Sequence, residues 1–218
     1  MKLQHPLRRY VGCYVFSPIN SFVAWWVTWS ACDYFNLGLP VWPQWSVQIL
    51  CIMPIALVLY DLCFYGLHRA MHTRILFRWV HSMHHEIRDP CPIDGLVAHP
   101  LETILVTWPL MLITKLLGCH VYILCAMLVI VVASVFKNHE HGADPDHFVH
   151  HRNLSKNFGP NIHLWDKLAG TFVSAAAPPS ERGRVEMGPR HRAMLQDFGL
   201  LIILILFILV SWCFSPYD

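Results

Sequence analysis

The chain has 218 residues, of which 55% are hydrophobic and only 14% are charged, with a formal net charge of +2. Its mean hydropathy of +0.42 is high for a soluble globular protein, and the apolar residues gather in long runs. This composition indicates an integral membrane protein, and the nearly balanced charge gives no electrostatic basis for a nucleic-acid partner.

Five apolar stretches are long enough to consider as membrane spans, namely 11–31, 45–67, 101–118, 120–136 and 198–214. A full crossing needs about 20 residues, so the second and fifth are the best candidates. The first is interrupted by polar residues and Pro18. The third and fourth are separated only by residues 118–120 and predict a helical hairpin whose arms are short for a full crossing.

The segments that connect the apolar stretches are alternately rich in basic residues and free of them. Lys and Arg are frequent after the second stretch and after the hairpin, but absent from 33–45 and from the tail after 214. Because basic loops stay on the cytosolic side, this placement puts both histidine-rich segments in the cytosol. The apolar stretches and the Pro- and Gly-containing text at 175–189 divide the chain into an N-terminal membrane segment and loop (1–44), a central region (45–172), a linker (173–197) and a C-terminal transmembrane helix (198–214).

Three histidine clusters carry the chemistry. They are an HxxxH motif at His68 and His72, an HxxHH motif at His81, His84 and His85, and a second HxxHH motif at His147, His150 and His151. Residues three and four apart share one face of a helix, so each motif is expected to aim its imidazoles to one side. Eight imidazoles exceed the needs of one tetrahedral zinc, which predicts two metals; ligand type alone leaves iron, zinc, copper and nickel open.

Further residues are candidates for the same site. His99, His139, His141 and His163 lie near the clusters in sequence, whereas His5, His120 and His191 are interpreted as structural or surface groups. Metal-bound histidines usually donate their second nitrogen to a carboxylate or carbonyl. Asp61, Glu86 and Asp166 are the carboxylates predicted for this supporting role, with a helix cap or a solvated charge as the alternative.

These motifs together resemble the fatty acid hydroxylase/sterol desaturase superfamily. The matching text comprises residues 61–72, 76–86, 98–103, 147–151, 157–159 and 164–171, within 45–172. The stretch His99-Pro100-Leu101-Glu102-Thr103 most resembles methylsterol monooxygenases. The resemblance implies an all-α integral membrane protein with a four-helix transmembrane core of two helical hairpins and a cytosolic, histidine-rich helical cap; the C-terminal helix at 198–214 lies outside the match.

The resemblance also implies a chemistry. It implies two iron ions as cofactors (with zinc able to take the same ligands in purified protein), O2, and electrons from NAD(P)H through cytochrome b5 or a reductase. It implies a membrane lipid substrate and, in a eukaryote, the endoplasmic reticulum. Two departures stand out: His139-Glu140-His141-Gly142 leaves open whether His139 or His141 is the ligand, and the segment before His147 is short.

The leading hypothesis is therefore an O2-dependent oxidoreductase that hydroxylates or desaturates a lipid, with a sterol first and a fatty acyl or sphingoid-base substrate second. A non-catalytic, zinc-binding membrane protein is the alternative from another class. A metal transporter is disfavoured, because transporters bind near the bilayer midplane and these clusters lie at the ends of apolar stretches.

Overall fold

The computed structural model describes residues 15, 17–34, 48–87, 90–140 and 145–177. All of them belong to the first of two compact units, residues 1–187. The regular structure of the described residues is entirely helical, which confirms the all-α expectation for this part of the chain. The predicted C-terminal helix at 198–214 lies outside the described residues.

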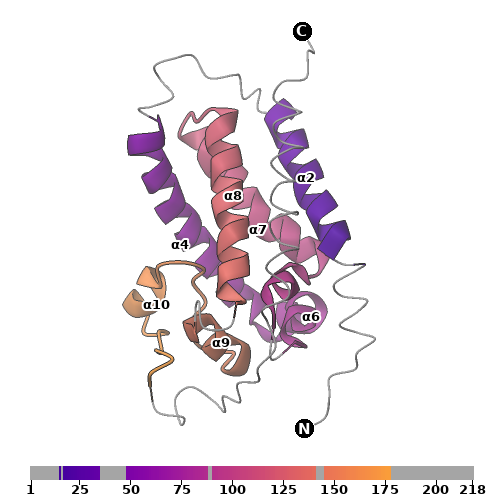
Figure 1. Ribbon diagram of the computed structural model, residues 1–218, viewed down its shortest axis with the longest axis vertical. Helices are drawn as coiled ribbons and strands as arrows, with labels where there is room; N and C mark the ends of the chain where they lie inside the picture. Colours follow the sequence, from indigo (N-terminus) through magenta and orange to yellow (C-terminus); the bar gives the residue numbers. More distant parts are fainter. Residues whose placement is uncertain (1–14, 16, 35–47, 88–89, 141–144, 178–218) are drawn as a thin grey trace. The chain divides into compact units, whose positions relative to one another are not determined.

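Long helices form the body of this unit and short ones gather at one end of it (Figure 1). The long helices are α2 (Ser17–Tyr34), α4 (Met53–Met71, continuing a π-helical turn η2 at Gln48–Ile52), α7 (Pro100–Leu116) and α8 (Val121–Asn138). Helix α7 packs against α2, α4 and α8. The short elements are α5 (Arg74–Leu76), η3 (Phe77–His81), α6 (Ser82–His85), η4 (Pro92–Leu96), α9 (Pro145–Arg152) and α10 (Leu164–Leu168).

The predicted hairpin is present as α7 and α8. Helix α7 starts at Pro100, behind an N-cap in which the His99 ring accepts a hydrogen bond from the Leu101 N–H at 3.1 Å. It ends where Gly118 takes a left-handed conformation (φ +62°), a backbone state that glycine adopts without steric cost. Helix α8 begins three residues later, so the chain reverses within one turn.

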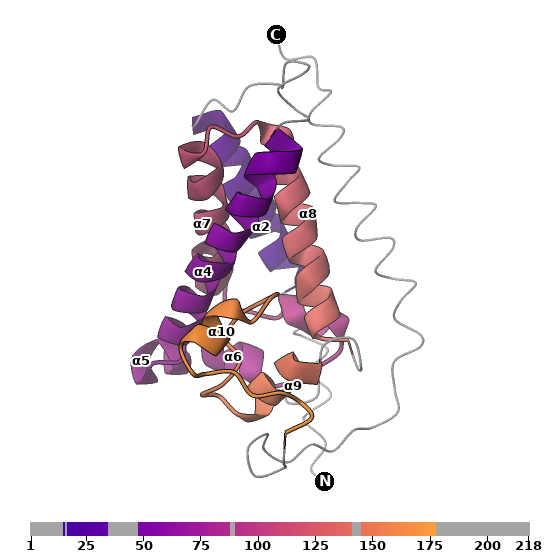
Figure 2. The ribbon, with the colours of Figure 1, turned by 90° about the vertical axis from the view of Figure 1, so that its left-hand side faces the viewer.

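The start of the η2–α4 helix is tied to this turn. The Gln48 side chain accepts a hydrogen bond from the His120 N–H at 3.0 Å and donates one to the Gly118 carbonyl at 3.4 Å. Both α4 and α8 therefore run away from the same point. Their last residues, and the histidines that follow, lie at the same end of the unit (Figure 2).

The polar residues that interrupt the first apolar stretch have a structural role. Asn20 is buried in α2 and donates hydrogen bonds to the carbonyls of Leu96 and Ala98, at 2.9 and 2.5 Å. These bonds satisfy the NH2 group of the Asn20 side chain inside an apolar helix and join α2 to the segment that precedes α7.

Two helices of the described residues are long and apolar enough to cross a membrane, Gln48–Met71 and Val121–Asn138. In Gln48–Met71 only 22% of the most apolar window is buried inside the protein. The exposed face of α4 carries Ile55, Val58, Leu59 and Leu62. An apolar face of this size points to a lipid environment. The four-helix transmembrane core stays a prediction, since α2 and α7 are not among the helices that meet the length and composition test.

Candidate metal centre

Nine histidines gather in two groups at the end of the unit reached by α4 and α8. The first group is His68, His72, His81, His85 and His150; the second is His84, His139, His147 and His151. Within each group the nitrogens that can bind a metal lie within 4.8 Å of one another. The groups are adjacent, because the ring centroids of His85 and His151 are 4.8 Å apart. These clusters can bind metal.

Both HxxHH motifs contribute to both groups. His81 and His85 enter the first group and His84 the second, whereas His147 and His151 enter the second and His150 the first. Within each motif the residues four apart stay together in one group, while the one between them enters the neighbouring group. The π-helical turn η3 leads into this arrangement and ends at His81.

The histidines lie in a dry environment. Eight of the nine are buried, and His72 is partly exposed. Burial, followed by repulsion from neighbouring imidazoles, pushes the pKa values of His81, His85, His147, His150 and His151 well below the usual range. For His72 the same causes lower the pKa to about 3. All these rings are therefore neutral at physiological pH, which is the form that binds metal.

Hydrogen bonds at the second ring nitrogen fix the tautomer of several histidines. The Nδ1 atom donates to a backbone carbonyl in His68 (Phe158, 2.7 Å), His84 (Val97, 3.2 Å), His139 (Val135, 2.6 Å) and His150 (Lys156, 2.6 Å). Because the carbonyl oxygens accept, Nδ1 of these four rings carries the proton and Nε2 presents a bare lone pair. In His81 the Nδ1 atom lies 2.8 Å from a Glu102 carboxyl oxygen, a close contact without hydrogen-bond geometry.

The lone pairs of His84 and His139 face each other in the second group, with their Nε2 atoms 3.4 Å apart. In the first group the lone pair of His68 faces Nε2 of His81 at 3.0 Å. Facing lone pairs repel unless a cation lies between them. Nitrogens bound at about 2.1 Å to one ion lie about 3.0 Å apart at right angles and about 3.4 Å apart in a tetrahedron. The spacing in both groups therefore fits a shared metal ion.

Unpaired nitrogens support the same fit. Nε2 of His150, a fully buried residue, and Nε2 of His72 have no hydrogen-bond partner among the described residues. A buried polar atom without a partner costs about 1–3 kcal/mol. A metal ion in the first group would satisfy both atoms.

Gly95 leaves room for His139. A Cβ atom at this position would lie 2.7 Å from His139 Nδ1 and 2.7 Å from a Val135 methyl group. Real Cβ atoms do not approach other atoms this closely, so any larger residue would push the imidazole away from the second group.

We expect Gly95→Ala to weaken metal binding in the second group by at least about tenfold, as losses of outer-shell support do. Metal titration of the purified protein against a competing chelator measures this affinity. Gly66→Ala is the matched control, because a Cβ at Gly66 meets no atom within 4 Å. Equal affinities of the two variants would contradict the role assigned to Gly95.

Glu102, which was not predicted for the site, contacts a histidine of the first group, whereas the role predicted for Glu86 stays a prediction. Glu86 is exposed at the end of α6, since adjacent residues of a helix point about 100° apart and its neighbour His85 faces the cluster. Glu102, in the first turn of α7, is buried and lies against His81. The sequence offered one signal for it, the His99-to-Thr103 stretch already singled out.

We expect Glu102→Ala to lower metal affinity by about 10–100-fold, because the partner that orients His81 is lost. The same chelator competition measures the change. Glu86→Ala provides the comparison and should leave the affinity within about twofold of wild type. A larger loss in Glu86→Ala than in Glu102→Ala would restore Glu86 to the role first predicted for it.

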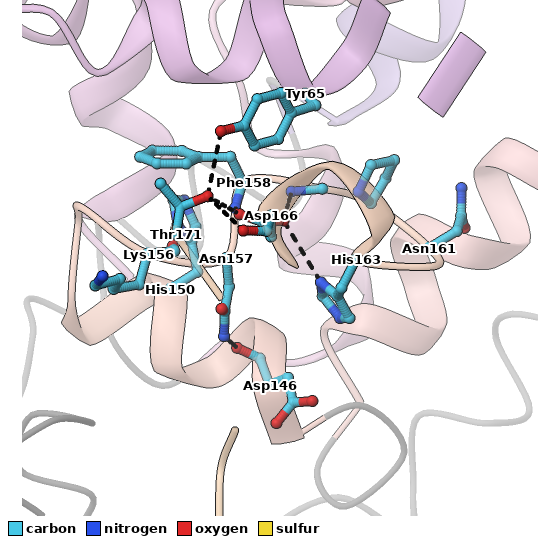
Figure 3. Close-up of polar contacts among 12 residues, drawn as sticks. Tyr65, Asp146, His150, Lys156, Asn157, Phe158, Asn161, His163, Asp166 and Thr171 are labelled. Atoms are coloured by element: carbon cyan, nitrogen blue, oxygen red, sulfur yellow. Dashed lines mark hydrogen bonds and ion pairs between the residues drawn. The ribbon is translucent and has the colours of Figure 1, made fainter. Parts of the chain in front are cut away.

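Asp166 acts on the histidines through the backbone (Figure 3). This fully buried carboxylate accepts hydrogen bonds from the N–H groups of Phe158 (2.9 Å) and Gly159 (2.6 Å) and from the Thr171 hydroxyl (2.7 Å). Burial would raise the pKa of Asp166, but the neighbouring His163 imidazole and these donors hold it below its usual value. Asp166 thereby fixes the Phe158 segment, whose carbonyl orients His68.

The same segment covers the first group with an aromatic ring. Phe158 packs against His68, His72 and His150, with ring centroids 5.2 to 5.9 Å apart. The preceding Asn157 adopts a left-handed conformation (φ +55°) and pairs with the backbone of Val173 through both ends of its amide. The tripeptide Asn157-Phe158-Gly159 was noted in the sequence only as part of the resemblance.

The remaining predicted residues lie elsewhere. Asp61 is buried in α4, and its carboxylate accepts a hydrogen bond from Asn161 at 3.3 Å, with no recorded contact to a histidine of either group. His99 caps α7, and His163 precedes α10 with its Nδ1 atom 3.7 Å from Asp166; neither belongs to a group. His139 lies in the second group, whereas His141 lies outside the described residues.

Comparisons with known proteins agree on one family. The chain is 27% identical over 163 residues to methylsterol monooxygenase 1 of Rattus norvegicus, covering 67% of this chain and 55% of that protein. It is 30% identical over 151 residues to a very-long-chain aldehyde decarbonylase of Oryza sativa subsp. indica, covering 62% of this chain and 56% of that protein. The chain thus spans about half the length of these relatives. No solved structure matches it. The model of the fatty acid hydroxylase family matches residues 53–171, more than half of the chain and all nine clustered histidines, so the chain belongs to the fatty acid hydroxylase family.

Proposed function

We propose that the two histidine groups hold two iron ions, and that the chain is an O2-dependent oxidoreductase that hydroxylates or desaturates a membrane lipid. The observation that carries the proposal is the pair of adjacent histidine groups in which Nε2 atoms face one another at 3.0 to 3.4 Å, several of them with a free lone pair because Nδ1 donates to a backbone carbonyl. Zinc can take the same ligands when the protein is purified.

The residues of the chain hold and shield this site. The ligands come from the ends of α4 and α8 and from η3, α6 and α9, so the site is built where four chain segments meet. When bound, an iron pair supplies the one-electron and oxygen chemistry that oxidises an unactivated C–H bond. Phe158, Phe77 and Phe64 pack against the rings of the first group in tilted or edge-on contacts and would shield it from water.

A lipid substrate follows from the apolar approach to the site. The exposed face of α4 carries Val58 and Leu62, and the helix ends at Met71, beside the partly exposed His72. A lipid lying along this face reaches the end of the unit at which the histidines gather. A sterol is the leading substrate, on the similarity to methylsterol monooxygenase 1; a fatty acyl or sphingoid-base substrate is the second, favoured by the equally close aldehyde decarbonylase relatives.

The proposed protein is a multi-pass membrane protein, in a eukaryote of the endoplasmic reticulum, with its histidine groups in the cytosol. The four-helix transmembrane core, the domain at 45–172 and the additional helix at 198–214 complete the proposed topology. Electrons come from NAD(P)H through cytochrome b5 or a reductase. Support for the orientation is the distribution of Lys and Arg along the sequence.

Lipid analysis of cells tests the function. Cells that express the chain are compared with cells that lack it and with cells that express His84→Ala, which removes a ligand candidate of the second group. We expect one oxidised or desaturated lipid class to depend on the wild-type chain and to be lost with His84→Ala. Identical lipid profiles in all three would contradict the proposal.

Purified protein is expected to contain close to two metal ions per chain, because each histidine group offers four or more nitrogen ligands. Elemental analysis by mass spectrometry gives the stoichiometry, and reconstitution with iron or zinc tests which ion supports O2 consumption. A single stable zinc per chain, without O2 consumption under any lipid and reductant, would favour the non-catalytic zinc-binding alternative.

A further inference from the structure

Two short elements beside the end of α4 expose large apolar side chains. In α5 and η3, Ile75 and Trp79 are 72% and 71% exposed; in α10, Leu164 and Leu168 are 38% and 72% exposed. Both pairs have the spacing of four residues that places side chains on one face of a helical segment. We refer to these four residues as the apolar collar.

The two parts of the apolar collar lie beside the same end of α4. Helices α5 and α10 both contact α4, near the end at which its last turn carries His68 (Figure 2). The Gln48–Met71 helix has 24 residues and is therefore about 36 Å long, against about 30 Å for the hydrocarbon layer of a bilayer. If its apolar length crosses the bilayer, its last turn and the collar beside it reach the headgroup layer.

Exposed basic residues lie next to the residues of the apolar collar. Arg74, Arg78 and Lys167 are interleaved with its residues and are exposed. The Arg78 guanidinium also lies over the Trp79 ring, 5.5 Å from its centroid. An apolar face with tryptophan and flanking basic residues is the composition that binds the boundary between acyl chains and lipid phosphates.

We propose that the apolar collar lies in the interface of the same bilayer that α4 crosses, with Ile75, Trp79, Leu164 and Leu168 among the upper acyl chains and the three basic residues on lipid phosphates. The proposal rests on the membrane placement given under the proposed function. In this arrangement η3, which ends at His81, also holds the metal centre at a fixed depth relative to the bilayer.

Site-specific photocrosslinking tests the collar. The photoreactive residue p-benzoylphenylalanine replaces one side chain at a time in the full chain, reconstituted in vesicles of phosphatidylcholine with phosphatidylserine. Trp79 and Leu168 report on the collar, and Val58, exposed on the middle of α4, reports on the membrane placement itself. Leu154 is the matched control, because it is 40% exposed in the loop that follows α9. Metal content of each variant shows that the site still assembles.

Lipid adducts at positions 58, 79 and 168, at least about fivefold above position 154, would support the proposal. Removing both charges with Arg74→Gln and Arg78→Gln should then lower the share of phosphatidylserine among the adducts at position 79 severalfold. If position 58 gives lipid adducts but the yields at positions 79 and 168 are no higher than at position 154, the collar proposal is wrong and the membrane placement is retained. A protein adduct at position 79 in cell membranes would overturn it in favour of a docking partner. The absence of lipid adducts at position 58 would overturn both.

Discussion

Replacement of His85 or of His151 by alanine is expected to remove bound metal and to abolish turnover, while the protein still inserts into membranes. Each residue belongs to a different histidine group, and each is buried. Loss of an outer-shell partner already costs about 10–100-fold in metal affinity or activity, so loss of a ligand should cost more than 100-fold. Insertion depends on the apolar helices and not on metal, so the two properties should separate.

Metal analysis, lipid oxidation and membrane fractionation measure these effects together. His99→Ala is the matched control, since His99 lies close to the clusters in sequence but in neither group. It removes an N-cap interaction, worth about 1 kcal/mol, and should retain metal. Full lipid oxidation by His85→Ala or His151→Ala would show that these histidines are structural.

Asp166→Ala is expected to destabilise the protein by several kcal/mol, on the order of 3–5, because it leaves buried donors without their charged acceptor. The donors are the N–H groups of Phe158 and Gly159 and the hydroxyl of Thr171. The Phe158 carbonyl should shift with them, so the variant should also lose metal from the first group through His68.

Thermal unfolding of the purified protein, followed together with metal content, measures both effects. Thr171→Val supplies the graded comparison, because it removes only one donor to Asp166 and should cost about 1 kcal/mol. If Asp166→Ala unfolds at the same temperature as Thr171→Val and keeps its metal, the carboxylate is not the support of the Phe158 segment.

Helical periodicity accounts for the part of the site that the sequence predicts. The spacings of His68 with His72, and of His81 with His85, place ring pairs on single helical faces, and both pairs do lie together. The hairpin of α7 and α8 follows from two apolar runs around Gly118. It brings the third cluster back to the first two, as expected.

The assignment of His84 and His150 to opposite groups could not be predicted in this way. It depends on how η3, α6 and α9 approach one another, which no single-helix pattern contains. The hydrogen-bond acceptors of the histidine Nδ1 atoms could not be predicted either, because every residue has a backbone carbonyl and the one of Lys156 is not distinguished by its sequence. Glu102 was missed for a related reason: it is 21 residues from His81 in sequence, and only the fold brings the two side chains together.

The distance along the chain between the partners in the first group has a consequence for biosynthesis. His68 and the carbonyl of Phe158 that orients it are 90 residues apart. At translation rates of about 5–20 residues per second, roughly 5 to 20 seconds pass between the synthesis of one and of the other. During that interval the first histidines emerge without the carbonyl, the ring of Phe158 or the candidate ligand His150. Complete metal loading is therefore a late event that follows membrane insertion of α4 and reports that the chain has been made at least as far as the Asp166 network.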